Sequence, residues 1–148
     1  MSDVKAALKT CEDLDKEKLI EYGVKLDNRD ALVHYQFAEG KLCNIIYLLE
    51  KLHTDPSLYI KDYEEVEKEL TNKYGAGKTD YQWKNTKYKD DTKYHGFAVS
   101  RGMLVLETSR PFNNGRVVHL LSGTIDTNIK HCIHFENTQL SKTVSTTN

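Results

Sequence analysis

The sequence predicts an α+β domain in which helices pack on one face of an antiparallel β-sheet. The expected elements run in the order helix, three strands, helix, then four or five strands. Strands that come in runs, with helices kept apart from them, favour an antiparallel sheet over a βαβ pattern. Two matching turn signals, Gly40-Lys41-Leu42 and Gly102-Met103-Leu104, each follow an expected helix. They predict a tandem repeat of one α-βββ unit.

The length of the chain, 148 residues, fits one domain. We expect a single α+β domain over residues 1–136, with half-repeats at about 2–50 and 55–136. Residues 137–148 are rich in Thr and Ser, and so poor in apolar side chains that they predict a flexible polar tail. A chain of this length buries a sufficient core without a disulfide or a metal ion.

The first half begins with an expected short helix over Ser2–Thr10, which Ser2 or Asp3 can cap. A strand over Leu19–Leu26 follows and ends in turn residues. Apolar and polar side chains then alternate from Val33 to Phe37 before Gly40 turns the chain into Leu42–Leu49. That returning strand is apolar on both faces, which is typical of a central strand.

The strongest single element is a helix that begins near Asp55-Pro56-Ser57 and ends at Gly75. Proline suits the first turn of a helix, and glycine suits the position just after its end. Apolar side chains recur every three or four residues and form a stripe that should face the sheet. These side chains are Tyr59, Tyr63, Val66, Leu70 and Tyr74.

The second half is expected to hold a long polar segment and then a run of strands. The segment from Ala76 to Gly96 is rich in lysine and aspartate, and a short strand is expected around Tyr81 to Lys84. Alternating apolar residues and glycine-containing turns predict four further strands. Their bounds are Phe97–Ser100, Met103–Ser109, Arg116–Ser122 and Ile129–Glu136.

The net charge of −1 hides an uneven distribution along the chain. Residues 1–70 contain ten basic and sixteen acidic side chains, whereas residues 71–148 contain eleven basic and six acidic ones. This difference can steer a charged partner or favour self-association. An acidic helical half and a basic loop-rich half also produce it without any function.

Three cysteines, Cys11, Cys43 and Cys132, do not make a disulfide framework. Cys43 and Cys132 lie in apolar segments, where a free cysteine acts as a small hydrophobic side chain, and one disulfide is the alternative. No apolar stretch approaches the ~20 residues of a membrane-spanning helix. The residues after Met1 lack the apolar core of a signal peptide. The compartment stays open, since a full-length form could be exported or anchored to a membrane.

Several short motifs resemble those of small bacterial domains that are exported or lipid-anchored. They are Asp3-Val4-Lys5, Tyr35-x-Phe37-x-x-Gly40-Lys41-Leu42, Lys73-Tyr74-Gly75, W-K-N-x-x-Y-K-D-D from Trp83 to Asp91, and Gly96-Phe97-Ala98-Val99. The layout of these domains is similar to that of the beta-lactamase inhibitor protein and of small outer-membrane assembly lipoproteins. The resemblance implies tandem helix-plus-antiparallel-sheet units and a bacterial source. It implies no active-site residue.

Motifs for cofactors and metals are weak. Gly75-Ala76-Gly77-Lys78-Thr79 ends like a phosphate-binding loop, but it follows a helix where that motif needs a strand. A glycine-capped helix end is the better interpretation. His131 and His134 should point to opposite faces of one strand, with His119 on a neighbouring strand, so a single zinc site is not favoured. We expect no cofactor and no metal.

Catalytic and nucleic-acid sites are not favoured either. Cys43 and His34 could be neighbours across the first hairpin as nucleophile and base, but both lie in segments that should be packed. Lysines interleaved with aromatic residues could contact nucleic acid. Aspartates cancel much of that charge, and the pI near 6.6 is too low for such a domain. We therefore expect neither an enzyme nor a nucleic-acid partner.

Protein recognition fits the polar segment better, because tyrosine and tryptophan are enriched in interface hot spots. The candidate binding residues are Tyr81, Trp83, Tyr88, Tyr94 and His95. For Trp83 the alternative is a place in the core between helix and sheet. The sequence thus predicts a non-enzymatic binding module for a protein or the cell envelope. The alternative function is a small immunity or inhibitor protein that blocks a toxin or hydrolase through the acidic helix face around Glu64, Glu65 and Glu69.

Overall fold

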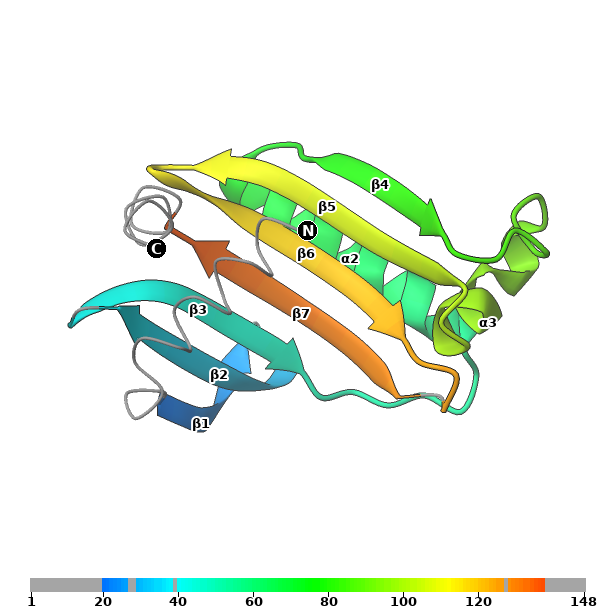
Figure 1. Cartoon of the computed structure of the whole chain (residues 1–148), viewed down its shortest axis with the longest axis horizontal. Coiled ribbons are helices and arrows are strands. Elements are labelled where there is room, and N and C mark those ends of the chain that lie inside the picture. The colour runs from blue at the N-terminus through cyan, green and yellow to red at the C-terminus, as the bar shows by residue number, and fades with distance from the viewer. Residues whose placement is uncertain (1–19, 27–28, 39, 127, 138–148) are drawn as a thin grey trace. The chain divides into compact units, whose positions relative to one another are not determined.

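The computed structural model describes residues 20–26, 29–38, 40–126 and 128–137. The expected helix Ser2–Thr10, the turn after Leu26 and the tail from residue 138 lie outside these ranges. The described chain forms a seven-stranded sheet in the order β1-β2-β3-β7-β6-β5-β4, together with the helices α2 and α3 (Figure 1). The pairs β1–β2, β2–β3 and β4–β5 are antiparallel. The predicted α+β class is confirmed.

The chain divides into two compact units. The first unit takes in residues up to Glu50, Pro111–Val118 and the residues from Ile133 on, and the second takes in Lys51–Arg110 and His119–Cys132. Three long strands contribute to both units. They are β5 (Leu104–Phe112), β6 (Gly115–Gly123) and β7 (Ile129–Glu136).

In the first unit, β1 (Ile20–Leu26), β2 (Arg29–Ala38) and β3 (Lys41–Leu49) form an antiparallel meander. The predicted turn at Gly40 is confirmed: its φ of 75° is left-handed, which glycine adopts without strain. Alternation places Ala31 and Val33 in the core with almost no exposed area.

A bulge interrupts the β2–β3 register next to this turn. Gln36 lies opposite Asn44, but Phe37 lies opposite Leu42, so Cys43 is the extra residue. Cys43 is disulfide-bonded. The interpretation of Cys43 as a free apolar side chain is therefore wrong, and the alternative of a disulfide holds for it. His34 lies opposite Ile46 and not opposite Cys43.

In the second unit, α2 (Ser57–Tyr74) covers one face of the strands (Figure 1). Both predicted ends are confirmed: Asp55 Oδ1 accepts hydrogen bonds from Ser57, and Gly75, with a φ of 90°, ends the helix. Four residues of the predicted stripe are buried, namely Tyr59, Tyr63, Val66 and Leu70. Tyr59 and Tyr63 belong to a core cluster that also includes Ala98, Val99, Leu104, Leu106 and Leu121.

The expected strand Phe97–Ser100 is wrong, because these residues belong to the short helix α3 (His95–Ser100). Its end is a Schellman motif, in which Gly102 N donates to Val99 O at 3.0 Å and Met103 N to Ala98 O at 2.8 Å. Gly102 therefore ends a helix, whereas Gly40 turns a hairpin. Gly40 and Gly102 both have a φ of 75°, but the two matching turn signals are not copies of one hairpin.

The other strands of the second half agree with the sequence prediction to within a few residues. β7 (Ile129–Glu136) has the predicted bounds, while β5 and β6 are longer than expected. The short strand expected at Tyr81 to Lys84 is the end of a six-residue strand, β4 (Lys78–Trp83). Within the described part of the chain, no helix has the length and apolar character needed to span a membrane.

Candidate functional site

The five residues predicted for partner binding lie in three places of the second unit. Tyr81, on β4, is 53% exposed. Trp83 is partly buried against the core and meets the ring of His95 edge-on at 4.9 Å. Tyr88, Tyr94 and His95 lie together on the segment that follows β4. The structure thus separates Tyr81 from the others and gives Trp83 the core-facing position that was the alternative for it.

The segment from Lys84 to Tyr94 is a chain of tight turns rather than an open loop. Asn85 Oδ1 accepts the amide of Lys87 at 3.0 Å, and Lys89 N donates to Thr86 O at 3.0 Å. Asp91 N then donates to Tyr88 O at 3.1 Å. His95 Nε2 bonds Lys89 O at 3.0 Å, which ties the segment back to the start of α3. These local bonds fix the positions of the aromatic side chains.

Three aromatic rings form one exposed group at this end of the unit. The rings of Tyr88 and Tyr94 are 5.0 Å apart, and those of Tyr88 and Phe97 are 5.7 Å apart and perpendicular. Lys87 Nζ lies over the Tyr88 ring at 5.3 Å, and Lys93 Nζ lies over the Tyr94 ring at 5.1 Å. We call these five residues the aromatic–lysine cluster.

Phe97 joins the cluster because α3 lies close to the start of α2. A Cβ added at Gly96 would be 2.4 Å from Pro56 O, so only glycine permits this approach. The helical turn then directs Phe97 outward while Ala98 and Val99 are buried. The sequence prediction missed Phe97 because a strand was expected there. The adjacent glycine was the available signal of a close backbone approach.

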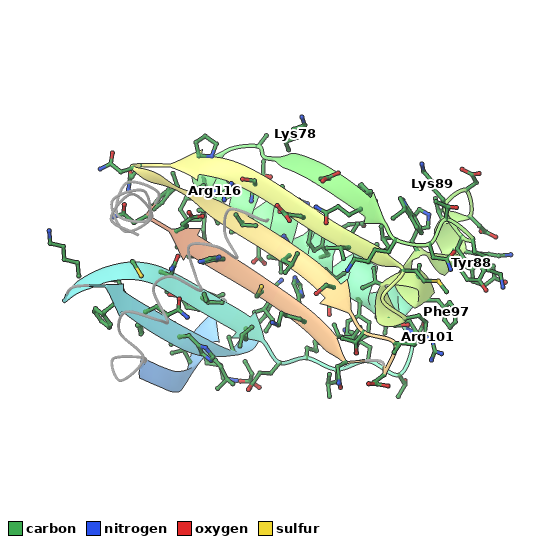
Figure 2. All side chains as sticks on the ribbon, in the orientation of Figure 1. Lys78, Tyr88, Lys89, Phe97, Arg101 and Arg116 are labelled. Atoms are coloured by element: carbon green, nitrogen blue, oxygen red, sulfur yellow. The ribbon has the colours of Figure 1, made fainter. Side chains whose placement is uncertain are left out.

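Apolar and cationic groups are exposed together on this surface. Tyr94 is 41% exposed and Phe97 is 39% exposed. Figure 2 shows Tyr88, Lys89, Phe97 and Arg101 at the same end of the unit, away from Lys78. Aromatic rings supply contact area at a low entropic cost, and lysines supply charge. The arrangement can bind a partner that offers apolar side chains and negative charge, but it holds no nucleophile paired with a base.

A second group of polar side chains is buried in the same unit and forms a hydrogen-bonded network. We define it as Glu67, Arg110, His119 and His131. Arg110 Nη2 donates to Glu67 Oε2 at 2.6 Å, and His119 Nδ1 bonds Glu67 Oε1 at 2.7 Å. His119 Nε2 lies 2.6 Å from His131 Nε2. The side chains of Arg110 and His119 have no exposed area.

Proton positions in the network follow from what each atom can do. An ionised carboxylate only accepts, so His119 Nδ1–H donates to Glu67. When His119 is neutral, its other nitrogen accepts, and His131 Nε2–H then donates to His119 Nε2. Arg110 also donates through Nε to Gly75 O at 2.9 Å. Each charged group of the network therefore has a partner of opposite charge or a hydrogen-bond acceptor.

Tyr63 connects this network to the sheet. Its ring stacks on His119 with centroids 3.9 Å apart, and its hydroxyl donates to His119 O at 3.1 Å. The same hydroxyl accepts from Thr108 at 2.6 Å, and Thr108 in turn accepts from Thr79 at 2.8 Å. Burial raises the pKa of Tyr63 above its ordinary value. This phenol therefore stays neutral and holds α2 on the strands.

Opposing effects set the pKa of Glu67. Burial raises it, but hydrogen bonds from His119 and Arg110 outweigh burial and hold the pKa below its ordinary value.

Burial has the dominant effect at Cys132, where it raises the thiol pKa to about 11. A thiol with that pKa is protonated and unreactive at neutral pH. The network and its neighbours thus form a buried, internally hydrogen-bonded part of the fold.

The spacing of His119 and His131 differs from that of two ligands on one zinc ion. Two imidazole nitrogens on one tetrahedral zinc, each about 2.0–2.1 Å from the metal, are about 3.3 Å apart. The separation of 2.6 Å between His119 and His131 fits a direct hydrogen bond. Among the residues that the structure describes, no three His, Cys, Asp or Glu side chains are grouped so that they could hold a metal ion.

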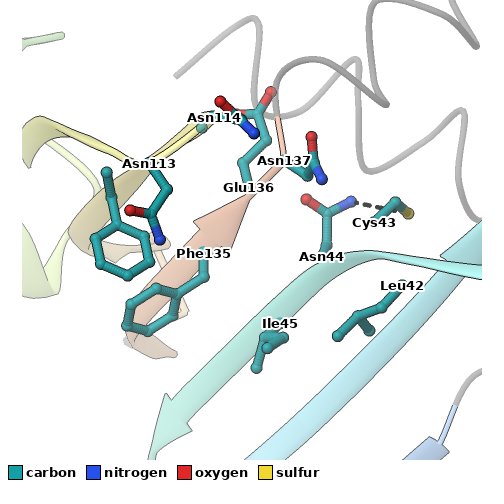
Figure 3. A pocket seen from close by; sticks show the side chains of 11 residues that line it. Leu42, Cys43, Asn44, Ile45, Asn113, Asn114, Phe135, Glu136 and Asn137 are labelled. Carbon is teal, nitrogen blue, oxygen red and sulfur yellow. Dashed lines mark hydrogen bonds between the residues drawn. The ribbon is translucent and has the colours of Figure 1, made fainter.

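A separate pocket of about 250 Å³ lies in the first unit (Figure 3). Asn44 and Glu136 line it and are already engaged: Asn44 Oδ1 bonds His134 Nε2 at 2.7 Å, and Arg116 Nε donates to Glu136 at 2.9 Å. Burial, followed by the charge of Arg116, lowers the pKa of His134 to about 3. His134 is therefore a neutral structural group that donates to Asn44.

Family models, curated proteins and solved structures were all compared with the chain, and none matches.

Proposed function

We propose that this chain is a non-enzymatic binding module that contacts a protein partner through the aromatic–lysine cluster. The observation that carries the proposal is the exposure of Tyr94 and Phe97, at 41% and 39%, within a group of rings flanked by lysines. Exposed large apolar side chains gathered in one place are informative, whereas single ones are common. The rigid turns from Lys84 to Tyr94 reduce the entropy lost on binding.

The proposed partner is a protein of the bacterial envelope, as the resemblance of the sequence motifs to exported bacterial domains suggests. Between Lys84 and Arg101 the chain has five basic and two acidic side chains, which favours a partner surface with acidic residues around an apolar centre. The disulfide at Cys43 is in keeping with an oxidising compartment such as the bacterial periplasm.

The alternative is an inhibitor that binds a toxin or hydrolase through the outer face of α2. Glu64 and Glu65 are both exposed there, and negative charge on a helix can mimic an acidic substrate. The two proposals place the contact on different sides of the second unit. They therefore predict different effects for matched variants.

The experiment captures partners from a bacterial envelope extract on the immobilised full chain. The matched variants are Tyr94→Ala/Phe97→Ala in the cluster and Glu64→Lys/Glu65→Lys on α2. We expect Tyr94→Ala/Phe97→Ala to weaken binding of the captured partner at least about 30-fold, as the loss of an interface hot spot does. Glu64→Lys/Glu65→Lys should leave the affinity unchanged. The reverse pattern would support the inhibitor. Tight capture that neither variant weakens would refute both proposals.

A further inference from the structure

Among the strands that the structure describes, β4 is the last in the sheet and pairs with β5 alone (Figure 1). The pairs run from Lys78↔Ser109 to Trp83↔Leu104. One step beyond the register, Lys84 N donates to Met103 O at 2.8 Å. In an antiparallel ladder, residues that bond the neighbouring strand alternate with residues whose N–H and C=O point away from it. Lys84, Gln82 and Asp80 therefore bond β5.

The intervening residues, Thr79, Tyr81 and Trp83, direct their backbone N–H and C=O away from the sheet. Among the described residues, no hydrogen bond reaches these groups from that side. The first four residues of β4 are exposed, and the Tyr81 ring is 53% exposed. An open edge of this kind is a template for another strand.

We propose that the β4 edges of two copies of this chain pair antiparallel about a twofold axis at Gln82. Three registers near the centre of β4 place the outward-facing backbone N–H and C=O groups of one copy opposite those of the other. An axis at Asp80 sets the two Asp80 carboxylates side by side, and an axis at Tyr81 sets Lys78 opposite Lys84. Like charges directly opposite each other destabilise a strand pair.

The axis at Gln82 instead produces complementary pairs. Asp80 lies opposite Lys84 of the second copy, and the twofold axis repeats this opposite-charge pair. Tyr81 lies opposite Trp83 of the second copy on the other face, so the exposed ring gains an aromatic neighbour. Each Tyr81–Trp83 pair also exchanges two backbone hydrogen bonds. The strip of contact is short, so the dissociation constant should be on the order of 10 μM to 1 mM, as for transient contacts.

The first experiment measures self-association by sedimentation velocity from about 5 μM to about 1 mM protein. We expect the average mass to rise towards twice that of the monomer. Asp80→Lys and Lys84→Asp should each weaken the dimer by about tenfold or more, because each places like charges opposite each other. The double variant Asp80→Lys/Lys84→Asp should restore association. A chain that stays monomeric, or a double variant without recovery, would overturn the proposal.

The second experiment tests the register by cross-linking. Residues at the axis form a non-hydrogen-bonded pair with Cα atoms about 4.5 Å apart, which is within the range of a disulfide. Gln82→Cys should therefore form a covalent dimer under mild oxidation. The matched control is Asp80→Cys, whose two copies would be about 14 Å apart along the strands. Equal cross-linking of both variants, or of the unchanged chain, would contradict the axis at Gln82.

Discussion

The buried polar network and the aromatic–lysine cluster lie in one compact unit and reverse the usual distribution of side chains. The network places charged groups inside, where Arg110 and His119 have no exposed area. The cluster places aromatic rings outside, around Tyr94 and Phe97. A buried charge needs its partners within the chain, whereas an exposed ring gains most from a partner outside it. The network therefore serves folding, and the cluster is the surface proposed for recognition.

The largest expected effect is on the network. Glu67→Ala leaves the Arg110 guanidinium buried without its carboxylate, which should lower the free energy of unfolding by about 3–5 kcal/mol. Urea denaturation followed by circular dichroism measures this. The matched control, Glu65→Ala on the exposed face of the same helix, should stay within about 0.5 kcal/mol of the unchanged chain. A loss below about 1 kcal/mol for Glu67→Ala would show that the network does not hold the fold.

The second largest effect concerns α3, the short helix that carries Phe97 of the cluster. Gly96→Ala places a Cβ against Pro56 O, and backbone must shift to accept it. We expect a loss of about 1–3 kcal/mol, as for other overpacked sites, and altered NMR signals for Phe97. Gly23→Ala is the control, since a Cβ there has nothing within 4 Å. Equal stability of the two variants would argue against the close approach of α3 to α2.

The third effect is a dependence of stability on pH. The ordinary pKa of Glu67 is 4.5, and its pKa in the folded chain is lower. Stabilisation from this carboxylate is therefore complete above about pH 5 and decreases as the pH falls through the folded pKa. We expect the free energy of unfolding to decrease between pH 5 and pH 3. Glu67→Gln should show a smaller change over this interval, and an identical pH profile would contradict the assignment.

The smallest effect on stability is expected at the cluster. Tyr94→Ala and Phe97→Ala remove side chains that are about two-fifths exposed, so each should lower the unfolding free energy by less than about 1 kcal/mol. Thermal melting measures the change. A loss as large as that of Glu67→Ala would mean that the rings support the core and are not free for a partner.

The sequence predicted those elements whose signals are local. The long helix α2 has a proline at its start and Gly75 at its end, and β7 alternates between two faces, so both were predicted at nearly their observed bounds. The helix α3 was missed because Phe97 and Val99 favour a strand locally, while the contact of Gly96 with Pro56 arises only in the folded chain.

The network was missed for a different reason. Glu67 and His119 are 52 positions apart, and Glu67 and Arg110 are 43 apart. No periodic pattern connects residues at such separations, so only the pairing of strands and the packing of α2 bring them together. Tyr88, Tyr94 and His95 were predicted together because a single segment contains them. Its tight turns then decide which of the rings are exposed.

The central claim is that the cluster, and not the acidic face of α2, is the recognition surface. The most direct test measures the affinity of the captured envelope partner for the unchanged chain and for Tyr94→Ala/Phe97→Ala, with both proteins shown to be folded. The account predicts at least about 30-fold weaker binding by this variant and unchanged binding by Glu64→Lys/Glu65→Lys. Unchanged affinity after removal of both rings, with loss of binding in the α2 variant, would contradict it.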